Sequence, residues 1–373
     1  MTKSDDKRVP ALRFKGFTDE WEQRKLGHTI KYIGTGKSKC NDKSTGKYKI
    51  LGSTGVIGYS NHYDYDGDFI LTARVGANAG KLYRHSGKVK ITDNTVFIQG
   101  PQLNFIYYLL SNFDLKKLSF DSGQPLIKAS ELKKLFLNFP ITSIERKNIG
   151  IIFNKLECIL SLQQRKVKLI NKLKNALLTH FISKTSSQSA SKTLKDITNI
   201  RGGYAFKSSE FTKSGFPVIK IANISQNGEI EGPYSYVLSL KSDYQLAKND
   251  IVLAMSGATT GKIARVNSNN IYLQNQRVGY FVNNHKIDYN YLYYLLISDQ
   301  FKRQLERILI SGAQPNVSAS DIEKFKFVIL KSKKQQSKIS TLFKHIDYAL
   351  KAGNNKMHTL IQIKQFLLQN MFI

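Results

Sequence analysis

Two stretches of the chain repeat apolar residues at steps of three and four, which is the spacing of one face of an α-helix. One stretch runs from Ile149 to Phe181 and the other from Ile339 to Leu367, and no proline interrupts either. A helix from about Ile144 to Ile182 would be roughly 58 Å long at ~1.5 Å per residue. Such a long apolar stripe needs a partner, and the other helix is the obvious one. The alternative is that each helix packs only on its own globular part.

Short runs rich in β-branched and aromatic residues precede each helix and alternate with Gly, Asn and Ser turns. They predict strands in two mixed α/β parts, so the expected fold class is α+β. The runs are YKILGS, DFILTA and TVFIQ in the first part, and FPVIKIANI, DIVLAM and RVGYFV in the second. Within these parts, LNFIYYLLSNFDLKKLSF and YNYLYYLLISDQFKRQLERIL each predict a single helix.

The chain contains two copies of one unit. SGQPLIKASELKKLFLNFP, from Ser122, resembles SGAQPNVSASDIEKFKFVIL, from Ser311, and after a one-residue gap they align at a constant offset of 190. Gln124 and Gln314 meet in this alignment. Upstream, GANAGKL resembles GATTGKI, and FIYYLLSN resembles YLYYLLIS. Matches in the same order predict a pseudo-twofold internal repeat, with the two long helices paired as an antiparallel coiled coil.

The repeat and the Ser-rich string SKTSSQSASK divide the chain into five expected parts. The loops of the two globular parts differ strongly, while the helices stay similar. That contrast suggests a shared scaffold that presents two different recognition surfaces. The expected parts are a first globular part at 1–140, a central helix at 141–183, a linker at 184–192, a second globular part at 193–332 and a C-terminal helix at 333–373.

Charge points to a polyanionic partner. The chain has 57 Lys and Arg against 27 Asp and Glu, a formal net charge of +30. Hydrophobic residues make up 41% and aromatic residues 11%, so this is a folded protein rather than a disordered basic tail. Nucleic-acid phosphates attract Lys and Arg, and release of their counterions favours binding. Nucleic acid is therefore the first partner to consider.

Compartment signals favour the cytoplasm. Only two cysteines occur, Cys40 and Cys158, so a disulfide framework is not expected. The first residues have no apolar core of a signal peptide, and no run of about 18 apolar residues predicts a membrane span.

Strings that imitate enzyme motifs are incomplete. KYIGTGKS at 31–38 has Lys31 where a phosphate-binding loop needs its first glycine. The GANAGKL and GATTGKI strings have only three residues between their glycines, and their repetition favours a tight turn. DYDGD at 64–68 lacks the closing glutamate of a calcium loop. The seven histidines are scattered and no GxSxG string occurs. We therefore expect no catalytic site, no metal and no cofactor bound by this chain.

Two variable globular parts that alternate with two similar long helices, in a basic chain without catalytic motifs, resemble the specificity subunit of Type I restriction–modification systems. The opening LRFKGFTDEWEQRKLGH, the GxxxGK turns, the SGxQP-like segments and the YYLL helices are similar to that family as well. The resemblance covers essentially the whole chain.

This resemblance implies that each globular part is a target recognition domain for double-stranded DNA, and that the paired helices are a rigid spacer. It implies two partner modification subunits, which methylate adenine N6 with S-adenosylmethionine. It also implies restriction subunits, which would use ATP and Mg. Domains on a rigid spacer would contact half-sites with centres roughly 10 bp apart. Because the two recognition surfaces differ, the target is expected to be asymmetric.

Candidate DNA-binding residues are the polar and basic side chains of the loops, because polar side chains read bases and Lys and Arg mostly contact phosphates. In the first domain they are Lys37, Lys39, Lys43, Lys47, Ser53, Thr54, Arg74, Asn78, Lys81 and Asn94. In the second they are Lys207, Lys220, Asn223, Ser225, Ser256, Thr259, Thr260, Lys262, Asn275, Gln276 and Arg277.

Three other functions remain open at this point. The first is a stand-alone DNA-binding regulator without a methyltransferase partner. The second is an enzyme with an unrecognised site, such as a fused nuclease. The third is an RNA-binding protein, although domains on a rigid spacer suit a regular duplex better than single-stranded loops.

Overall fold

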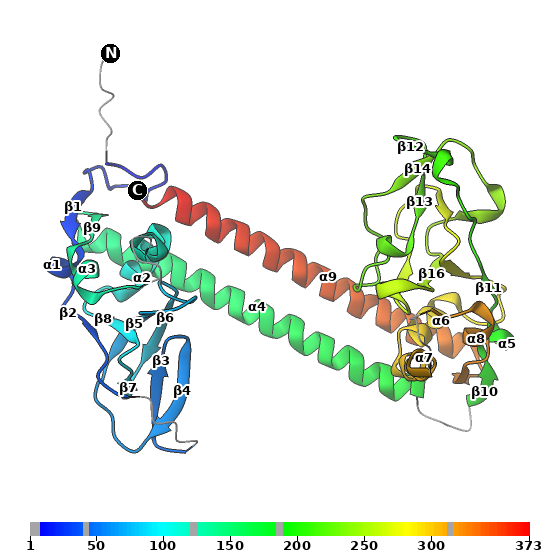
Figure 1. Ribbon diagram of the computed structural model, residues 1–373, viewed down its shortest axis with the longest axis horizontal. Coiled ribbons are helices and arrows are strands. Elements are labelled where there is room, and N and C mark those ends of the chain that lie inside the picture. Colours follow the sequence, from blue (N-terminus) through cyan, green and yellow to red (C-terminus); the bar gives the residue numbers. More distant parts are fainter. Residues whose placement is uncertain (1–7, 40–44, 120–125, 184–188, 312–315) are drawn as a thin grey trace, which may run out of the picture. The chain divides into compact units, whose positions relative to one another are not determined.

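A computed structural model of the chain describes residues 8–39, 45–119, 126–183, 189–311 and 316–373 (Figure 1). The chain divides into two units, 1–165 with 354–373, and 166–353. The two long helices, α4 (Ser143–Ser183) and α9 (Lys333–Asn370), each contribute one part to each unit. Both stretches that the apolar spacing predicted as long helices are therefore helical.

The described residues of the first domain form two sheets, a separate strand pair, three α-helices and one 3-10 helix. Its four-stranded sheet has the order β2-β8-β5-β6, its three-stranded sheet the order β4-β3-β7, and β1 pairs with β9. Its elements are β1 (Glu22–Lys25), α1 (Leu26–Thr29), β2 (Tyr32–Thr35), β3 (Tyr48–Gly52), β4 (Gly55–Ser60), β5 (Asp68–Ala73), β6 (Leu82–Ser86), β7 (Val89–Ile91), β8 (Thr95–Gln99), α2 (Leu103–Phe113), the 3-10 helix η1 (Leu115–Ser119), α3 (Ala129–Lys134) and β9 (Phe136–Phe139).

The four-stranded sheet is covered on both faces, which explains why DFILTA is apolar without alternation. Phe69 and Leu71 of β5 pack in a cluster with residues of β3 and β7. Ile70, between them, faces the opposite way and joins the core of α2 and α4. Successive side chains of a strand point to opposite faces, so a strand between two layers buries both sets. Figure 1 shows β3, β4 and β7 on the side of this sheet that lies away from α2.

The second domain is built in the same way. Its sheets have the orders β11-β19-β16-β17 and β12-β14-β13-β18-β15, and β10 pairs with β20. Its elements are β10 (Ser189–Thr193), α5 (Leu194–Ile197), β11 (Ile200–Arg201), η2 (Ser208–Glu210), β12 (Phe211–Thr212), β13 (Phe216–Ile219), η3 (Ile221–Asn223), β14 (Ser235–Val237), η4 (Ser242–Tyr244), β15 (Gln245–Leu246), β16 (Ile251–Ala254), η5 (Gly257–Thr259), β17 (Ile263–Arg265), β18 (Tyr272–Gln274), β19 (Val278–Phe281), α6 (Tyr289–Leu296), α7 (Asp299–Ser311), α8 (Ala319–Glu323) and β20 (Lys326–Leu330).

The strand orders extend the internal repeat from the helices to the globular parts. The order β2-β8-β5-β6 corresponds to β11-β19-β16-β17. The pairing of β3 with β7 is parallel, and so is that of β13 with β18. Each domain thus has one parallel pair among its antiparallel strand pairs, which agrees with an internal repeat.

Within each unit, α4 and α9 run antiparallel. In the first unit the Phe153 ring lies 5.7 Å from that of Phe372, and Lys364 Nζ donates to Glu157 Oε1 at 2.9 Å, so positions rise on α4 as they fall on α9. In the second unit Lys174 Nζ lies 2.6 Å from Asp347 Oδ1. The four charged residues are related by the same offset of 190 as the repeat. The helices form the antiparallel coiled coil that the sequence predicts.

The opening segment joins the ends of both helices in the first unit. Arg13 donates to both carboxylate oxygens of Glu145, at 2.6 and 2.9 Å, and the Leu12 amide donates to the Asn370 carbonyl at 2.8 Å. Trp21 follows and is buried beside Phe372. The segment that resembles the start of specificity subunits therefore has a packing role.

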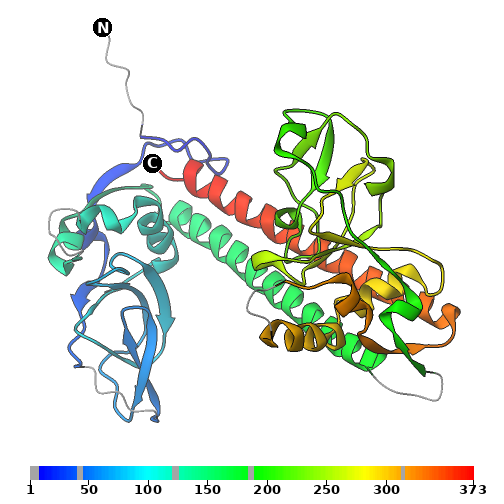
Figure 2. The same cartoon turned by 45° about the vertical axis from the view of Figure 1, so that its right-hand side comes forward.

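Two details differ from the sequence prediction. Each of the two helices predicted as single is divided into two. The first breaks at Asp114, which has a φ of 56°. The second breaks before Ser298, whose carbonyl accepts the Lys302 amide of the next helix. Residues 189–192, expected in the linker, form most of β10, which pairs with β20 (Figure 2). Residues 184–188, Gln124 and Gln314 lie outside the described residues.

Candidate nucleic-acid interface

In the first domain, four connecting segments meet at one end of the two sheets. We call residues 36–39, 52–54, 74–81 and 92–94 the first loop cluster. The Arg74 amide donates to the Asn94 carbonyl at 2.9 Å, and Ser53 Oγ donates to the same carbonyl at 3.4 Å. The Asp93 amide donates to the Ser38 carbonyl at 3.2 Å. Residues that are up to 56 positions apart in the sequence thus share one surface.

The GxxxGK string forms a tight turn in both domains. Gly76 and Gly80 have φ of 81° and 83°, and Gly257 and Gly261 have φ of 75° and 86°. The Gly80 amide donates to the Ala73 carbonyl at 3.2 Å, and the Gly261 amide to the Ala254 carbonyl at 2.8 Å. Because these amides are bonded inside the turn, they do not form a phosphate cradle. The prediction of a repeated tight turn is confirmed, and glycine is needed at these left-handed positions.

Most of the first-domain candidates gather in this cluster. Lys37 and Lys39 follow β2, Ser53 and Thr54 connect β3 to β4, Arg74, Asn78 and Lys81 lie on the β5–β6 turn, and Asn94 precedes β8. The Arg74 guanidinium forms no ion pair or hydrogen bond with another described residue. Two candidates do not join. Lys43 lies outside the described residues, and Lys47 precedes β3 at the opposite end, above the Tyr48 ring.

A cleft borders the β5–β6 turn and was not predicted. It has a volume of about 500 Å³, and Asn78, Lys81, Tyr107 and Lys116 are among its lining residues. Lys116 belongs to η1, which the sequence predicted as part of a continuous helix. Only the break at Asp114 brings this lysine beside the turn, so the apolar spacing contained no signal for it.

Tyr83 fixes the β3–β4 connection from the neighbouring sheet. Its hydroxyl donates to the Gly52 carbonyl at 2.5 Å. Burial raises the pKa of Tyr83, so the hydroxyl stays protonated and remains a donor at neutral pH. This bond holds the backbone next to Ser53 and Thr54.

We expect Tyr83→Phe to lower the free energy of unfolding by about 1–3 kcal/mol, because a buried carbonyl loses its donor. Urea unfolding followed by Trp21 fluorescence measures this, since Trp21 is the single tryptophan of the chain and lies in the same unit. Tyr59→Phe is the control, because Tyr59 is 38% exposed. Equal effects of the two substitutions would contradict the assigned bond.

The second domain has the corresponding arrangement. We call residues 202–204, 219–220, 255–262 and 275–277 the second loop cluster. The Tyr204 amide donates to the Gln274 carbonyl at 2.9 Å, and the Asn275 amide to the Ile219 carbonyl at 3.1 Å. The Met255 amide donates to the Arg277 carbonyl at 3.0 Å. Met255 and Arg277 therefore occupy the positions that Arg74 and Asn94 occupy in the first domain.

Most of the second-domain candidates lie in the second loop cluster. Ser256, Thr259, Thr260, Lys262, Asn275, Gln276, Arg277 and Lys220 lie in the second loop cluster, and Gln276 and Arg277 are exposed. Lys207, at the start of η2, is exposed, and its amide donates to Glu210 Oε2 at 2.7 Å, outside the cluster.

Three candidates already use their polar groups inside the domain. The Asn223 amide donates to the carbonyls of Glu231 and Pro233, and its oxygen accepts the Lys220 amide. Ser225 Oγ accepts the Glu229 amide. Lys220 Nζ donates to Ser235 Oγ and lies 3.9 Å from the Phe211 ring centroid. Sequence alone could not separate these structural polar groups from free ones.

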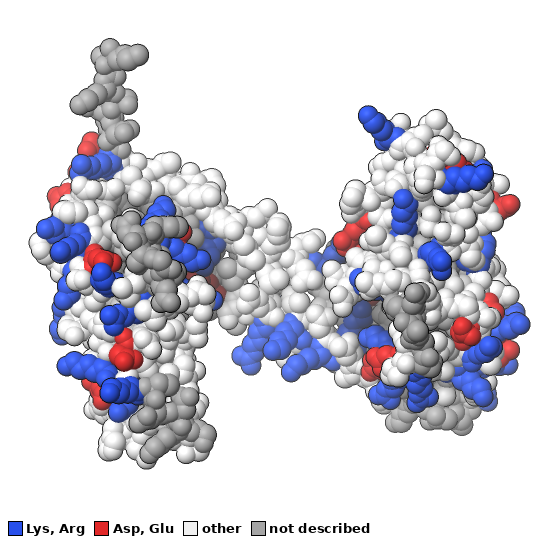
Figure 3. All heavy atoms as spheres, in the orientation of Figure 1, with Lys and Arg blue, Asp and Glu red and all other residues white. Residues whose placement is uncertain are grey.

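The charge of the surface fits a polyanion. On the face shown in Figure 3, Lys and Arg outnumber Asp and Glu on both units. Several of the acidic residues are paired with cations, as at Glu145, Glu157 and Asp347. The side-chain charge that remains without an ion-pair partner is therefore mainly positive.

Comparison with known proteins then identifies the family. The family model described as "Type I restriction modification DNA specificity domain" matches residues 18–175 and 187–361. The chain belongs to this family. Specificity subunits are the non-catalytic, DNA-recognising components of Type I restriction–modification systems. This specificity-family chain is therefore not itself an enzyme.

Similar proteins match over nearly the whole length of the chain. It is 26% identical over 93% of its length to the Type I restriction enzyme MjaVIII specificity subunit of Methanocaldococcus jannaschii, and covers 91% of that protein. The crystal structure of a Type-I restriction-modification system S subunit from M. genitalium superposes with a TM-score of 0.72 at 18% identity, covering 98% of this chain and 99% of that one. A structure from a study of complex assembly of a type I R-M system gives a TM-score of 0.53 at 12% identity, covering 94% and 97%.

Two further observations concern other kinds of site. None of the described helices is both long enough and apolar enough to cross a membrane. Within the described ranges, no three His, Cys, Asp or Glu side chains gather as metal ligands.

Proposed function

We propose that this specificity-family chain recognises a bipartite, asymmetric sequence in double-stranded DNA. In this proposal the first loop cluster reads one half-site and the second loop cluster reads the other. The observation that carries it is one backbone arrangement, with the same tight turn and the same strand pairing, that bears different side chains in the two domains. Because the backbone geometry is shared, both clusters can approach duplex DNA in the same way. Because their side chains differ, the two clusters bind different bases.

The clearest difference is the position of an arginine. In the first domain Arg74 is on the β5–β6 turn and Asn94 is opposite. In the second domain Arg277 stands at the position of Asn94, and Met255 stands at that of Arg74. Arginine donates two bonds to guanine, and asparagine pairs with adenine. We therefore assign base reading to Arg74, Asn94 and Arg277.

The lysines of the clusters have a different proposed role. Lys37, Lys39, Lys81 and Lys262 lie on or beside the turns and carry point charges rather than planar forks. Lysines of this kind fix the register of a protein on DNA through phosphates. Their removal should weaken binding to all sequences alike.

Single-molecule long-read sequencing of DNA from cells with and without the gene tests the proposal, with N6-methyladenine as the readout. A bipartite asymmetric methylated motif that disappears on deletion is expected. Unchanged methylation would contradict the proposed function and favour a stand-alone DNA-binding regulator. A palindromic motif would contradict two different half-sites.

We also propose that two modification subunits dock on the helix pair and that restriction subunits join through them. The support is an unusual exposure of apolar residues on α4, where Leu169 and Leu173 are 56% and 54% exposed. Exposed apolar rows on a helix are typical of protein interfaces. In this proposal the modification subunits bind S-adenosylmethionine, the restriction subunits use ATP and Mg, and the complex acts in the cytoplasm.

Leu169→Ser with Leu173→Ser is expected to reduce co-purification of the chain with its modification subunits at least tenfold, because the exposed leucines lose their apolar partner surface. Binding of the isolated chain to duplex DNA should stay unchanged. Lys166→Ser with Lys172→Ser, exposed on the same part of α4, is the matched control. Full co-purification of the leucine variant would contradict this docking surface.

The half-site spacing should depend on the helices. α4 begins among core residues of the first domain, at Ile149 and Phe153, and its last turns pack in the core of the second, at Leu178 and Ile182. We therefore propose that insertion of one heptad into both helices lengthens the unread spacer between the methylated half-sites. An unchanged spacer would contradict this.

A further inference from the structure

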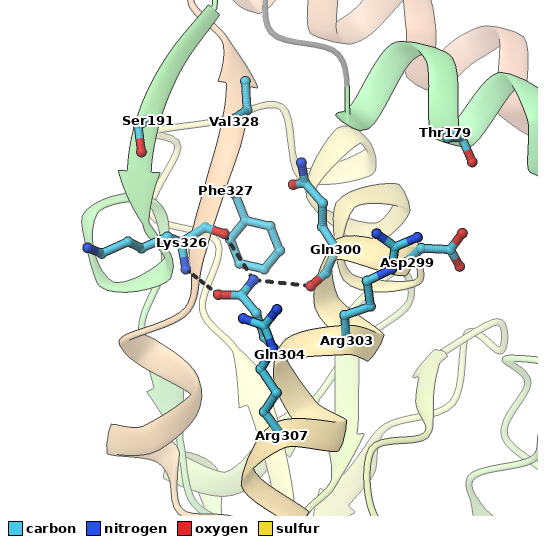
Figure 4. A pocket seen from close by; sticks show the side chains of 10 residues that line it. All are labelled: Thr179, Ser191, Asp299, Gln300, Arg303, Gln304, Arg307, Lys326, Phe327 and Val328. Atoms are coloured by element: carbon cyan, nitrogen blue, oxygen red, sulfur yellow. Dashed lines mark hydrogen bonds between the residues drawn. The ribbon is translucent and has the colours of Figure 1, made fainter.

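A cleft of the second unit lies outside the loop clusters. It is about 360 Å³ in volume and is lined by residues of α7, β10, β20 and the end of α4 (Figure 4). The polar side chains that line it include Thr179, Gln300, Arg303, Arg307 and Lys326, together with one acidic side chain, Asp299. The corresponding described stretch of the first domain is the short 3-10 helix η1, so among the described residues the long polar helix face belongs to the second domain.

The wall between α7 and β20 is fixed by one side chain. Gln304 Oε1 accepts the Lys326 amide at 2.8 Å, and Gln304 Nε2 donates to the Lys326 carbonyl at 2.9 Å (Figure 4). The Gln304 side-chain amide thus forms the two backbone hydrogen bonds with β20 that a neighbouring strand would form. Side chains on either side of Gln304 are therefore held at a defined separation from β20.

Two arginines of this face have no acidic partner. Arg303 and Arg307 are four residues apart, so they lie on the same face of α7, and both are exposed. Neither guanidinium group forms an ion pair or hydrogen bond with a described residue. The neighbouring lysines differ, because Lys302 pairs with Asp299, at 4.0 Å, and Lys324 pairs with Asp321.

One buried polar atom of the cleft also lacks a partner. Gln300 Oε1 is inaccessible to solvent and has no hydrogen-bond partner in the described part of the chain. Burial of an unpaired amide is unfavourable, and the oxygen and nitrogen ends of a glutamine are interchangeable by rotation. Because no solvent reaches this atom, it belongs to the packed wall of the cleft and not to its open surface.

We propose that this cleft binds a phosphate group. Two unpartnered guanidinium groups on one helix face, beside a concave surface, match the acceptor oxygens of a phosphate. Two sources can supply it, the backbone of a DNA duplex or free phosphate. The first rests on the proposed function. α7 adjoins the second loop cluster, since Leu305 lies against Gly261.

Arg303→Ala with Arg307→Ala, in the full-length chain, tests the assignment. Binding is measured by fluorescence anisotropy on a target duplex and a non-target duplex over a range of salt concentrations. If DNA is the source, affinity falls at least tenfold on both duplexes, and the slope of log affinity against log salt decreases by about 1.8, or ~0.9 for each lost phosphate contact. Target preference stays unchanged. Lys302→Ala with Lys324→Ala removes the same charge from ion-paired positions and should have less than half this effect.

A second measurement works without DNA. Inorganic phosphate is added to the wild type and to both double variants, and thermal unfolding is followed, with sulfate-free chloride at equal ionic strength as the reference. If free phosphate is the source, it stabilises the wild type and the lysine control but not the arginine variant. The result that overturns the proposal is equal behaviour of the two variants in both measurements. A loss of target preference in the arginine variant also overturns it, since the arginines would then read bases. The phosphate measurement needs no DNA. The assignment of the cleft can therefore be contradicted while the proposed function holds, and the proposed function can be contradicted while the cleft still binds phosphate.

Discussion

Arg277→Ala is expected to relax one base position of the second half-site and to leave the first half-site unchanged. The reason is the position of Arg277 between β18 and β19, where it is exposed, lacks an acidic partner among the described residues and stands opposite the apolar Met255. A bidentate arginine contributes about 1–3 kcal/mol of discrimination against the wrong base. That corresponds to roughly 5- to 150-fold, which is large enough to add new methylated sequences to a genome.

Long-read methylation mapping of cells that carry Arg277→Ala measures this directly. The mirror experiment is Arg74→Ala, which should relax the first half-site only. Lys213→Ala is a suitable control, because Lys213 lies in the β12–β13 connection, outside the second loop cluster. Uniform loss of methylation at all sites in the Arg277 variant would make Arg277 a phosphate contact and would contradict base reading.

Phe372→Ala is expected to lower the free energy of unfolding of the first unit by about 3–5 kcal/mol, the usual result of deleting a buried phenyl group. Phe372 lies two residues beyond the end of α9, and only 4% of it is exposed. Its ring centroid lies 6.3 Å from Trp21, 5.8 Å from Phe105 and 5.7 Å from Phe153. It thus joins the opening segment, α2 and α4 in one core.

Urea unfolding monitored by Trp21 fluorescence reports this change, because the single tryptophan of the chain touches the altered site. Ile373→Ala is the matched control, since the adjacent Ile373 is 46% exposed and should change stability by no more than about 0.5 kcal/mol. Equal unfolding midpoints for the two variants would show that the C-terminal residues do not complete the first core.

Local pattern was most informative where one periodicity runs for many residues. The long helices, the strands DFILTA and TVFIQ and the repeated GxxxGK turn all follow from it, because a helix face, a buried strand and a left-handed glycine are decided by neighbours in sequence. The family followed from the order of these elements. Prediction was less successful where apolar spacing continues through a break, as at Asp114, because α2 and η1 have similar spacing on either side of it.

The candidate interface shows the same division. Sequence indicated that loop Lys, Arg, Asn and Ser residues matter, but it could not tell that Asn223 serves its own domain or that Lys47 lies at the far end of β3. Both facts depend on hydrogen bonds between segments that are distant in the chain. Such bonds leave no periodic signal.

The sequence by itself determined that this is a duplicated, basic, two-domain chain with paired long helices and the character of a Type I specificity subunit. Only the tertiary structure decided which loops converge and that Phe372 packs against Trp21. It also decided that Arg74 donates its amide in the first domain's loop pair, whereas Arg277 accepts with its carbonyl in the equivalent pair of the second domain. The physical reason is that helix and strand periodicity is a property of adjacent residues. The position of a loop, in contrast, is set by sheet pairings such as Ile70 with Ile98, which join residues far apart in the chain.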